Sequence, residues 1–93
     1  MTFATEFPDY PAKDMPTIPP GFVDTSWHNN SAPSFANDKF SVWVDYADES
    51  QREYPGGKRF AVNEIDADGA FKSDWPDFET DDWDEVLRFV ASH

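Results

Sequence analysis

A run of oxygen-bearing side chains in the second half of the chain comes nearest to the spacing of a known metal site. Glu64, Asp66 and Asp68 alternate, and Gly69 follows them. Oxygen ligands at the first, third and fifth positions with glycine at the sixth are typical of the start of a calcium-binding loop. The twelfth position, where such a loop needs a bidentate carboxylate, is Trp75. A hairpin turn built on aspartate and glycine explains the same residues without metal. We therefore expect no cofactor and no metal here.

His28 is the other candidate for chemistry, and it lies in a polar stretch that includes Asn29 and Asn30. A histidine beside amides is more typical of a hydrogen-bonding loop than of a catalytic base. The serines nearby fit no nucleophile motif, and the chain has no His-Glu-x-x-His spacing. A small two-layer domain also rarely encloses a substrate-sized cavity. We expect no enzymatic activity, and an enzyme or calcium-binding domain is the third of our three hypotheses.

The charge of the chain is its most unusual property, because 19 acids against 7 bases give a net charge of −12. Residues 64–93 hold ten of these acids and two of the bases, which gives −8 in that segment alone. Such a field repels nucleic acid and anionic membranes, and it attracts basic protein surfaces. Acidic chains are often disordered, but an aromatic content of 17% favours a folded domain here.

Composition also bounds the class of protein. A chain of 93 residues without cysteine is one small domain without disulfides or thiolate metal sites. The start of the chain lacks the pattern of a secretory signal, and its apolar runs are far shorter than the roughly 20 residues that span a bilayer. These features predict a soluble, cytoplasmic protein.

Three segments show the patterns of strands, and a fourth completes a hairpin. Residues 40–46 alternate, with Phe40, Val42 and Val44 on one face and Trp43 on the other. Residues 22–28 are a weaker strand candidate, and residues 59–65 form the next strand with Phe60 and Val62 inward. Residues 29–34 form a loop, and residues 47–54 contain a helical turn. An aspartate and glycine turn at 66–69 predicts that residues 70–75 return as the partner of 59–65.

The last element is an amphipathic helix. Trp83, Val86, Leu87 and Val90 recur at helical spacing, and either Thr80 or Asp82 is suited to cap the first turn. The fold class is therefore α+β: a three- to four-stranded antiparallel sheet packed against one C-terminal helix. This domain spans residues 21–93. Residues 1–20 hold five of the eight prolines and predict an extended, Pro-rich N-terminal arm.

Two groups of aromatic residues bear on binding. Trp43 lies opposite the core residues of its strand, so it is either an exposed anchor for a partner or covered by the aromatic residues of the arm. Trp75 and Phe78 flank Pro76 and Asp77 inside the acidic segment. We expect both rings to pin this loop into the core, while the alternative is that they contact a basic, partly apolar surface.

The leading hypothesis is a non-catalytic binding protein that engages a basic protein surface. Its most concrete form is an inhibitor that occupies a nucleic-acid-binding surface, as DNA-mimic proteins do, a class that includes small acidic phage and anti-CRISPR proteins. The likeness to that class is one of composition. The second hypothesis is an assembly module that forms a homodimer or higher oligomer through its arm and an open sheet face. The predicted partner-binding residues are Trp43, Asp74, Asp77, Glu79, Asp81, Asp82 and Glu85.

Overall fold

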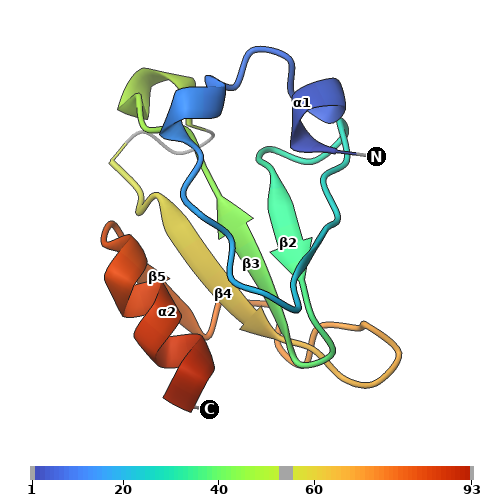
Figure 1. Cartoon of the computed structure of the whole chain (residues 1–93). Helices are drawn as coiled ribbons and strands as arrows, with labels where there is room; N and C mark the ends of the chain where they lie inside the picture. Colours follow the sequence, from blue (N-terminus) through green and yellow to red (C-terminus); the bar gives the residue numbers. More distant parts are fainter. Residues whose placement is uncertain (1, 53–55, 93) are drawn as a thin grey trace.

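The computed structural model describes residues 2–52 and 56–92, and its centre is an antiparallel sheet whose five strands lie in chain order (Figure 1). The strands are β1 (Val23–Asp24), β2 (Ser34–Ala36), β3 (Phe40–Val44), β4 (Phe60–Glu64) and β5 (Phe78–Thr80). The helical elements are α1 (Phe3–Glu6), the 3-10 turns η1 (Ala12–Asp14) and η2 (Glu49–Gln51), and α2 (Trp83–Ser92). The α+β class is confirmed, whereas the predicted count of three to four strands was too low.

The two central strands form where side-chain alternation predicted them. In β3 and β4, Val42 pairs with Val62 and Val44 pairs with Phe60, and all four side chains are buried on the same side of the sheet. Successive side chains of a strand point to opposite faces, so this pairing places the residues between them on the other face. One face of the sheet is thus committed to the hydrophobic core.

Strand β2 lies where we predicted the end of a loop. The side chain of Ser26 is fully buried, and its hydroxyl accepts the backbone N–H of Ser34 at 3.2 Å. Because the Ser26 hydroxyl takes the place of a backbone carbonyl as the acceptor for Ser34, β1 ends at Asp24. It therefore covers only part of the strand predicted at 22–28. Phe35 then carries β2 into the core.

The predicted return strand at residues 70–75 was wrong. The turn itself forms, with Gly69 at a positive φ of 83° and the Asp66 carboxylate accepting the N–H groups of Asp68 and Ala70. Beyond it only Phe71 bridges to Ile65. The Asp77 carboxylate accepts the N–H of Glu64 at 2.7 Å, so a side chain takes the place of a ladder bond and pairing resumes at β5.

Helix α2 packs its apolar stripe on β4 and β5. Val86 is 1% exposed, and Phe89 stacks on Phe78 with ring centroids 4.8 Å apart. Asp82 is the N-cap, since its carboxylate accepts the N–H of Asp84 at 2.9 Å. Thr80 supports this cap by accepting the N–H of Asp82 at 3.0 Å.

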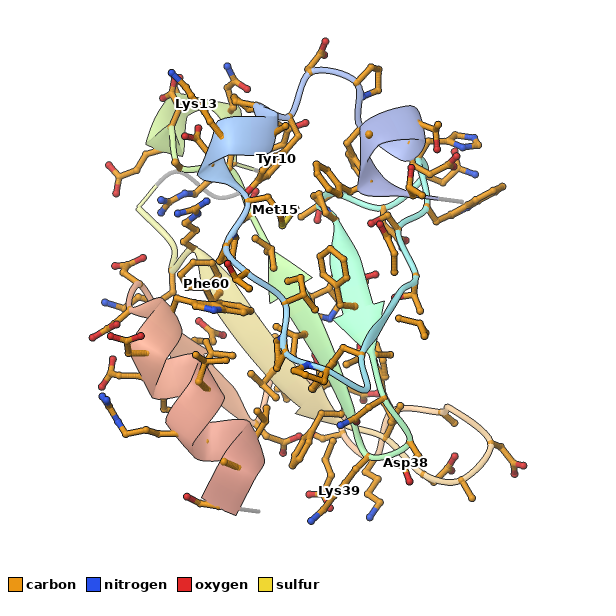
Figure 2. All side chains as sticks on the ribbon, viewed as in Figure 1. Tyr10, Lys13, Met15, Asp38, Lys39 and Phe60 are labelled. Atoms are coloured by element: carbon orange, nitrogen blue, oxygen red, sulfur yellow. The ribbon has the colours of Figure 1, made fainter. Side chains whose placement is uncertain are left out.

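The N-terminal segment contains helical turns, so the prediction of a wholly extended arm is not confirmed. This segment crosses the same face of the sheet as α2 (Figure 1). Phe7 and Tyr10 are 8% and 4% exposed and belong to the core cluster. In Figure 2 Tyr10 and Met15 point from this segment toward the strands. The apolar residues of the arm therefore complete the core rather than cover Trp43.

Arg59 fastens the arm to the sheet. Its guanidinium donates to the Tyr10 hydroxyl at 2.9 Å and to the backbone carbonyl of Asp14. Tyr10 in turn donates to the carbonyl of Asp45 at 3.1 Å. Burial raises the pKa of Tyr10, against the opposing effect of the Arg59 charge. The aromatic ring and its polar end are thus both satisfied inside the domain.

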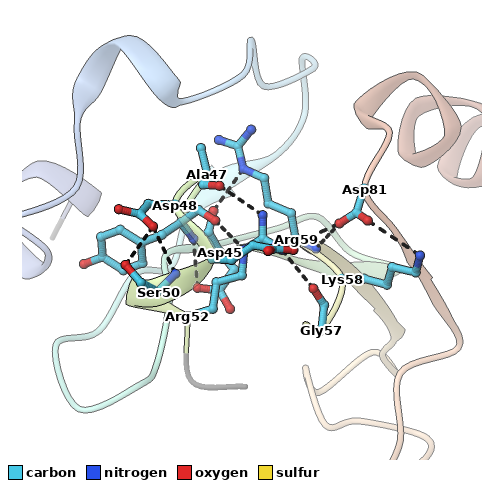
Figure 3. A network of polar contacts seen from close by, with 11 residues as sticks. Asp45, Ala47, Asp48, Ser50, Arg52, Gly57, Lys58, Arg59 and Asp81 are labelled. Atoms are coloured by element: carbon cyan, nitrogen blue, oxygen red, sulfur yellow. Dashed lines mark hydrogen bonds and ion pairs between the residues drawn. The ribbon is translucent and has the colours of Figure 1, made fainter. Parts of the chain in front are cut away.

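Arg52 organises the connection between β3 and β4. Its guanidinium donates to the carbonyl groups of Tyr46, Ala47 and Gly57, and only 7% of its side chain is exposed (Figure 3). The helical turn predicted within residues 47–54 is confirmed as η2. Its predicted end at Pro55 lies outside the described residues.

We predict that Tyr10→Ala lowers the free energy of unfolding by about 3–5 kcal/mol, because it removes a buried aromatic ring from the core. Urea denaturation followed by tryptophan fluorescence measures this change. Thr17→Ala is the matched control, since Thr17 is an exposed residue of the same segment, and it should shift the free energy by less than about 0.5 kcal/mol. Equal effects of the two substitutions would show that the arm is not part of the core.

Candidate binding site on the open face of the sheet

The face of the sheet opposite α2 and the arm, here called the open face, is covered by neither of them. Trp43 pairs with Ala61, and Ala61 pairs with Glu79, so these three residues form a row across β3, β4 and β5. The alternation predicted this position for Trp43. Its alternative cover, the arm, lies on the other side of the sheet.

The loop between β4 and β5 crosses part of the open face and adds two aromatic rings to it. Phe71 meets Trp43 edge to face, with ring centroids 6.2 Å apart and the planes at 87°. Trp75 lies farther along the loop and is 78% exposed. The sequence-based expectation that Trp75 and Phe78 both enter the core is therefore wrong for Trp75. Phe78 does pack against the core cluster.

Asn63 joins these aromatic residues to one another. The Trp43 indole N–H donates to the Asn63 side-chain oxygen at 3.2 Å, and the Asn63 amide donates to the Trp75 carbonyl at 3.2 Å. Asn63 is 4% exposed, and both hydrogen bonds are partly buried. The amide uses both its oxygen and its nitrogen, which favours one arrangement of these partners. The loop that carries Trp75 is thereby tied to the centre of β4.

These residues enclose a hollow of about 380 Å³. Its aromatic walls are Trp43, Phe71 and Trp75, and the acids Asp74 and Glu79 also line it. We call these five residues, with the space between them, the acidic aromatic hollow. A second hollow of about 580 Å³ lies along the open face toward β1 and β2, and it shares Trp43 and Phe71 with the first. Its lining includes the neutral polar residues Thr25, Asn30, Ser34, Asn37 and Ser41.

Two basic residues also line the acidic aromatic hollow, but each has acceptors elsewhere. Lys58 has its ammonium group 3.6 Å from an Asp81 carboxylate oxygen. The Arg59 guanidinium is bonded to Tyr10 and to Asp14 of the arm. Asp74 and Glu79 are therefore not paired with these two bases in the structure.

The other predicted acids accept hydrogen bonds that stabilise the junction of β4, β5 and α2. Asp77 bonds the backbone of β4, Asp82 caps α2, and Glu85 accepts a hydrogen bond from the Thr80 hydroxyl. Asp81 accepts the Arg59 N–H at 2.8 Å and lies near Lys58 and Arg52 (Figure 3). Of the predicted binding residues, the hollow thus brings together Trp43, Asp74 and Glu79.

Sequence reasoning missed Phe71 and Trp75 of the hollow, and also Asn63, which lines the same space. Asn63 follows Val62 in a predicted strand whose Phe60 and Val62 point inward, so alternation was the available signal for it. Phe71 lies in the segment that was wrongly predicted as a strand, where alternation gave no signal. Trp75 was recognised as an aromatic residue in the acidic segment but was placed in the core. Aromatic spacing alone does not tell which ring of such a loop is buried.

The two candidates for chemistry have other roles in the structure. The Asp66 carboxylate is used by backbone N–H groups of its own turn. Across residues 2–52 and 56–92, no three metal-binding side chains gather into a possible metal site. His28 lies 2.9 Å from the Glu6 carboxylate, and its ring contacts that of Trp27 at a tilt of 43°. The hydrogen bond from His28 lowers the pKa of Glu6 and ties α1 to the loop before β2.

Comparison with known proteins assigns no relatives to this α+β domain: no protein-family model, curated protein or solved structure matches the chain. None of the helices in the described part of the chain has the length and apolar character needed to cross a membrane.

We predict that Asp81→Asn weakens the fold at pH 7 and has a smaller effect at pH 3. The Arg59 N–H, followed by the charges of Lys58 and Arg52, lowers the pKa of Asp81 from its ordinary value of 3.8. A lowered pKa contributes stability that is present above the ordinary value and lost as the pH falls through the folded one. Thermal unfolding of both proteins at the two pH values measures the difference. An equal difference at pH 3 and pH 7 would contradict an ionic role for Asp81.

Proposed function

We propose that this protein is a non-catalytic binding protein whose open face engages a basic surface of another protein. The observation that carries the proposal is Trp75, which is 78% exposed beside Asp74 and Glu79 in the acidic aromatic hollow. A large exposed aromatic group is the type of residue that anchors protein interfaces. The adjacent carboxylates and the net charge of −12 favour a partner of the opposite sign and speed its encounter.

The finer form of the proposal is an inhibitor that blocks a nucleic-acid-binding surface. Surfaces that bind nucleic acid are rich in lysine and arginine, which neutralise phosphates. Carboxylates on a folded domain offer the same sign of charge to those side chains. Such a protein, of the DNA-mimic or anti-CRISPR type, competes with nucleic acid instead of binding it.

The same features bear on the assembly hypothesis. Self-association through the open face would bring two chains of net charge −12 together, which repulsion opposes. The apolar side chains Phe7 and Tyr10 of the arm are already buried in the core of their own chain. Charge and burial therefore favour a basic partner over a second copy.

We predict that a double substitution, Asp74→Asn with Glu79→Gln, weakens partner binding about twofold to thirtyfold at low salt. Exposed charges of this kind contribute about 0.2–1 kcal/mol each, and the loss should shrink as added salt screens them. The partner is first captured from the host lysate at low and high salt, identified and purified. Titration calorimetry then gives the dissociation constants of the unsubstituted protein and of the double variant for this partner.

The matched control is Asp9→Asn with Asp84→Asn, which removes two exposed acids outside the hollow. It should change the affinity less than the double substitution in the hollow. Equal losses would mean that only net charge matters, and failure to retain any basic protein at low salt would overturn the proposed function.

We also predict that the protein displaces nucleic acid from the partner. Fluorescence anisotropy of a labelled oligonucleotide bound to the purified partner measures this competition. The anisotropy should fall as the protein is added, and the hollow variant should need a higher concentration than the control variant. A stable ternary complex would contradict the inhibitor form while leaving the binding function intact.

A further inference from the structure

The acidic aromatic hollow has the chemistry of a receptor for one kind of side chain. Trp43 and Phe71 stand nearly perpendicular, at 87°, and so form two walls of a corner. Trp75 adds a third aromatic surface that is largely exposed. Aromatic faces carry negative electrostatic potential and attract cations placed over them.

Carboxylates complete this surface. Asp74 and Glu79 line the same hollow, and both are exposed. The combination of aromatic faces with carboxylates suits a cationic group with a flat apolar surface. An anion would be repelled by these carboxylates, and a purely apolar group would leave them without an opposite charge.

Arginine fits this combination better than lysine does. Its guanidinium is planar and weakly hydrated, so it stacks on indole rings while its edge donates paired hydrogen bonds to a carboxylate. The lysine ammonium is a compact, strongly hydrated charge that offers no flat face. The hollow of about 380 Å³ has room for an extended side chain.

The hollow is also partly preorganised for such a ligand. Asn63 bonds the Trp43 indole and the Trp75 backbone at 3.2 Å each, which holds the Trp43 ring and the backbone that carries Trp75. The basic residues at its rim are occupied, because Lys58 lies by Asp81 and Arg59 is bonded to the arm. Little rearrangement is then needed on binding, which favours affinity.

We propose that the acidic aromatic hollow binds an arginine side chain of the partner, with the guanidinium stacked on the aromatic walls and its N–H groups directed at Asp74 and Glu79. This inference rests on the proposed function and names the chemistry that the partner must present. It gives the exposed Trp75 a specific role, as the ring that selects arginine over lysine.

The test compares two end-blocked peptides, hexaarginine and hexalysine, which carry the same charge. Titration calorimetry with the full chain at matched ionic strength should give a dissociation constant at least about threefold lower for hexaarginine, as one exposed cation–π contact would provide. Trp75→Ala should remove this preference without abolishing the weaker, charge-driven binding. Because Trp75 is 78% exposed, this variant should unfold at nearly the same urea concentration as the unsubstituted protein.

Trp27→Ala is the matched control, because Trp27 is also an exposed tryptophan, 41% accessible, and its ring lies against His28 outside the hollow. It should leave the preference for hexaarginine unchanged. Equal binding of the two peptides, or equal effects of the two tryptophan substitutions, would overturn the arginine proposal.

Failure of this inference is distinguishable from failure of the proposed function. If neither peptide binds while a basic partner is retained and depends on Asp74 and Glu79, the arginine site is wrong and the function stands. If hexaarginine is preferred through Trp75 but no basic protein is retained from the lysate, the arginine site stands and the proposed function fails.

Discussion

The pairing of β3 with β4 is the constraint on which both faces of this domain depend. Val42 opposite Val62 directs one set of side chains into the core, and Trp43 opposite Ala61 directs the other set to the open face. A shift of one residue would exchange the two sets, because side chains alternate along a strand. The core under α2 and the acidic aromatic hollow are therefore two results of one register.

The acids of the C-terminal segment divide into two groups with different physical roles. Asp77, Asp81 and Asp82 accept backbone N–H groups near the junction of β4, β5 and α2, where each bond replaces a missing partner. Asp74 and Glu79 line the hollow instead. A charge excess read from composition thus overstates the number of acids available to a partner.

Long elements with a clear period were predictable from sequence. The alternation around Val42 and the helical stripe around Val86 located β3, β4 and α2. Strands β2 and β5 are three residues long, too short for a period to appear, and their positions depend on side-chain bonds from Ser26 and Asp77. The local pattern of apolar and polar residues does not predict such long-range hydrogen bonds.

The candidate site was predictable to a similar degree. Alternation placed Trp43 opposite the core, and composition drew attention to Asp74 and Glu79. The exposure of Trp75 was not predictable, because aromatic spacing does not tell which ring of the loop packs on the core, and here Phe78 does. Asn63 links β3 to the loop between β4 and β5 only in the folded structure. No pattern along the chain predicts these contacts.

Both ends of the described chain lie over the covered face: the arm begins near α1, and α2 ends at Ser92 on the same side of the sheet (Figure 1). The open face is built instead from the interior of the chain, and the residues of the acidic aromatic hollow lie between Trp43 and Glu79. An attachment at either end therefore does not cover that face. The molecule is suited to immobilisation or fusion in an orientation that displays Trp75 to the solution.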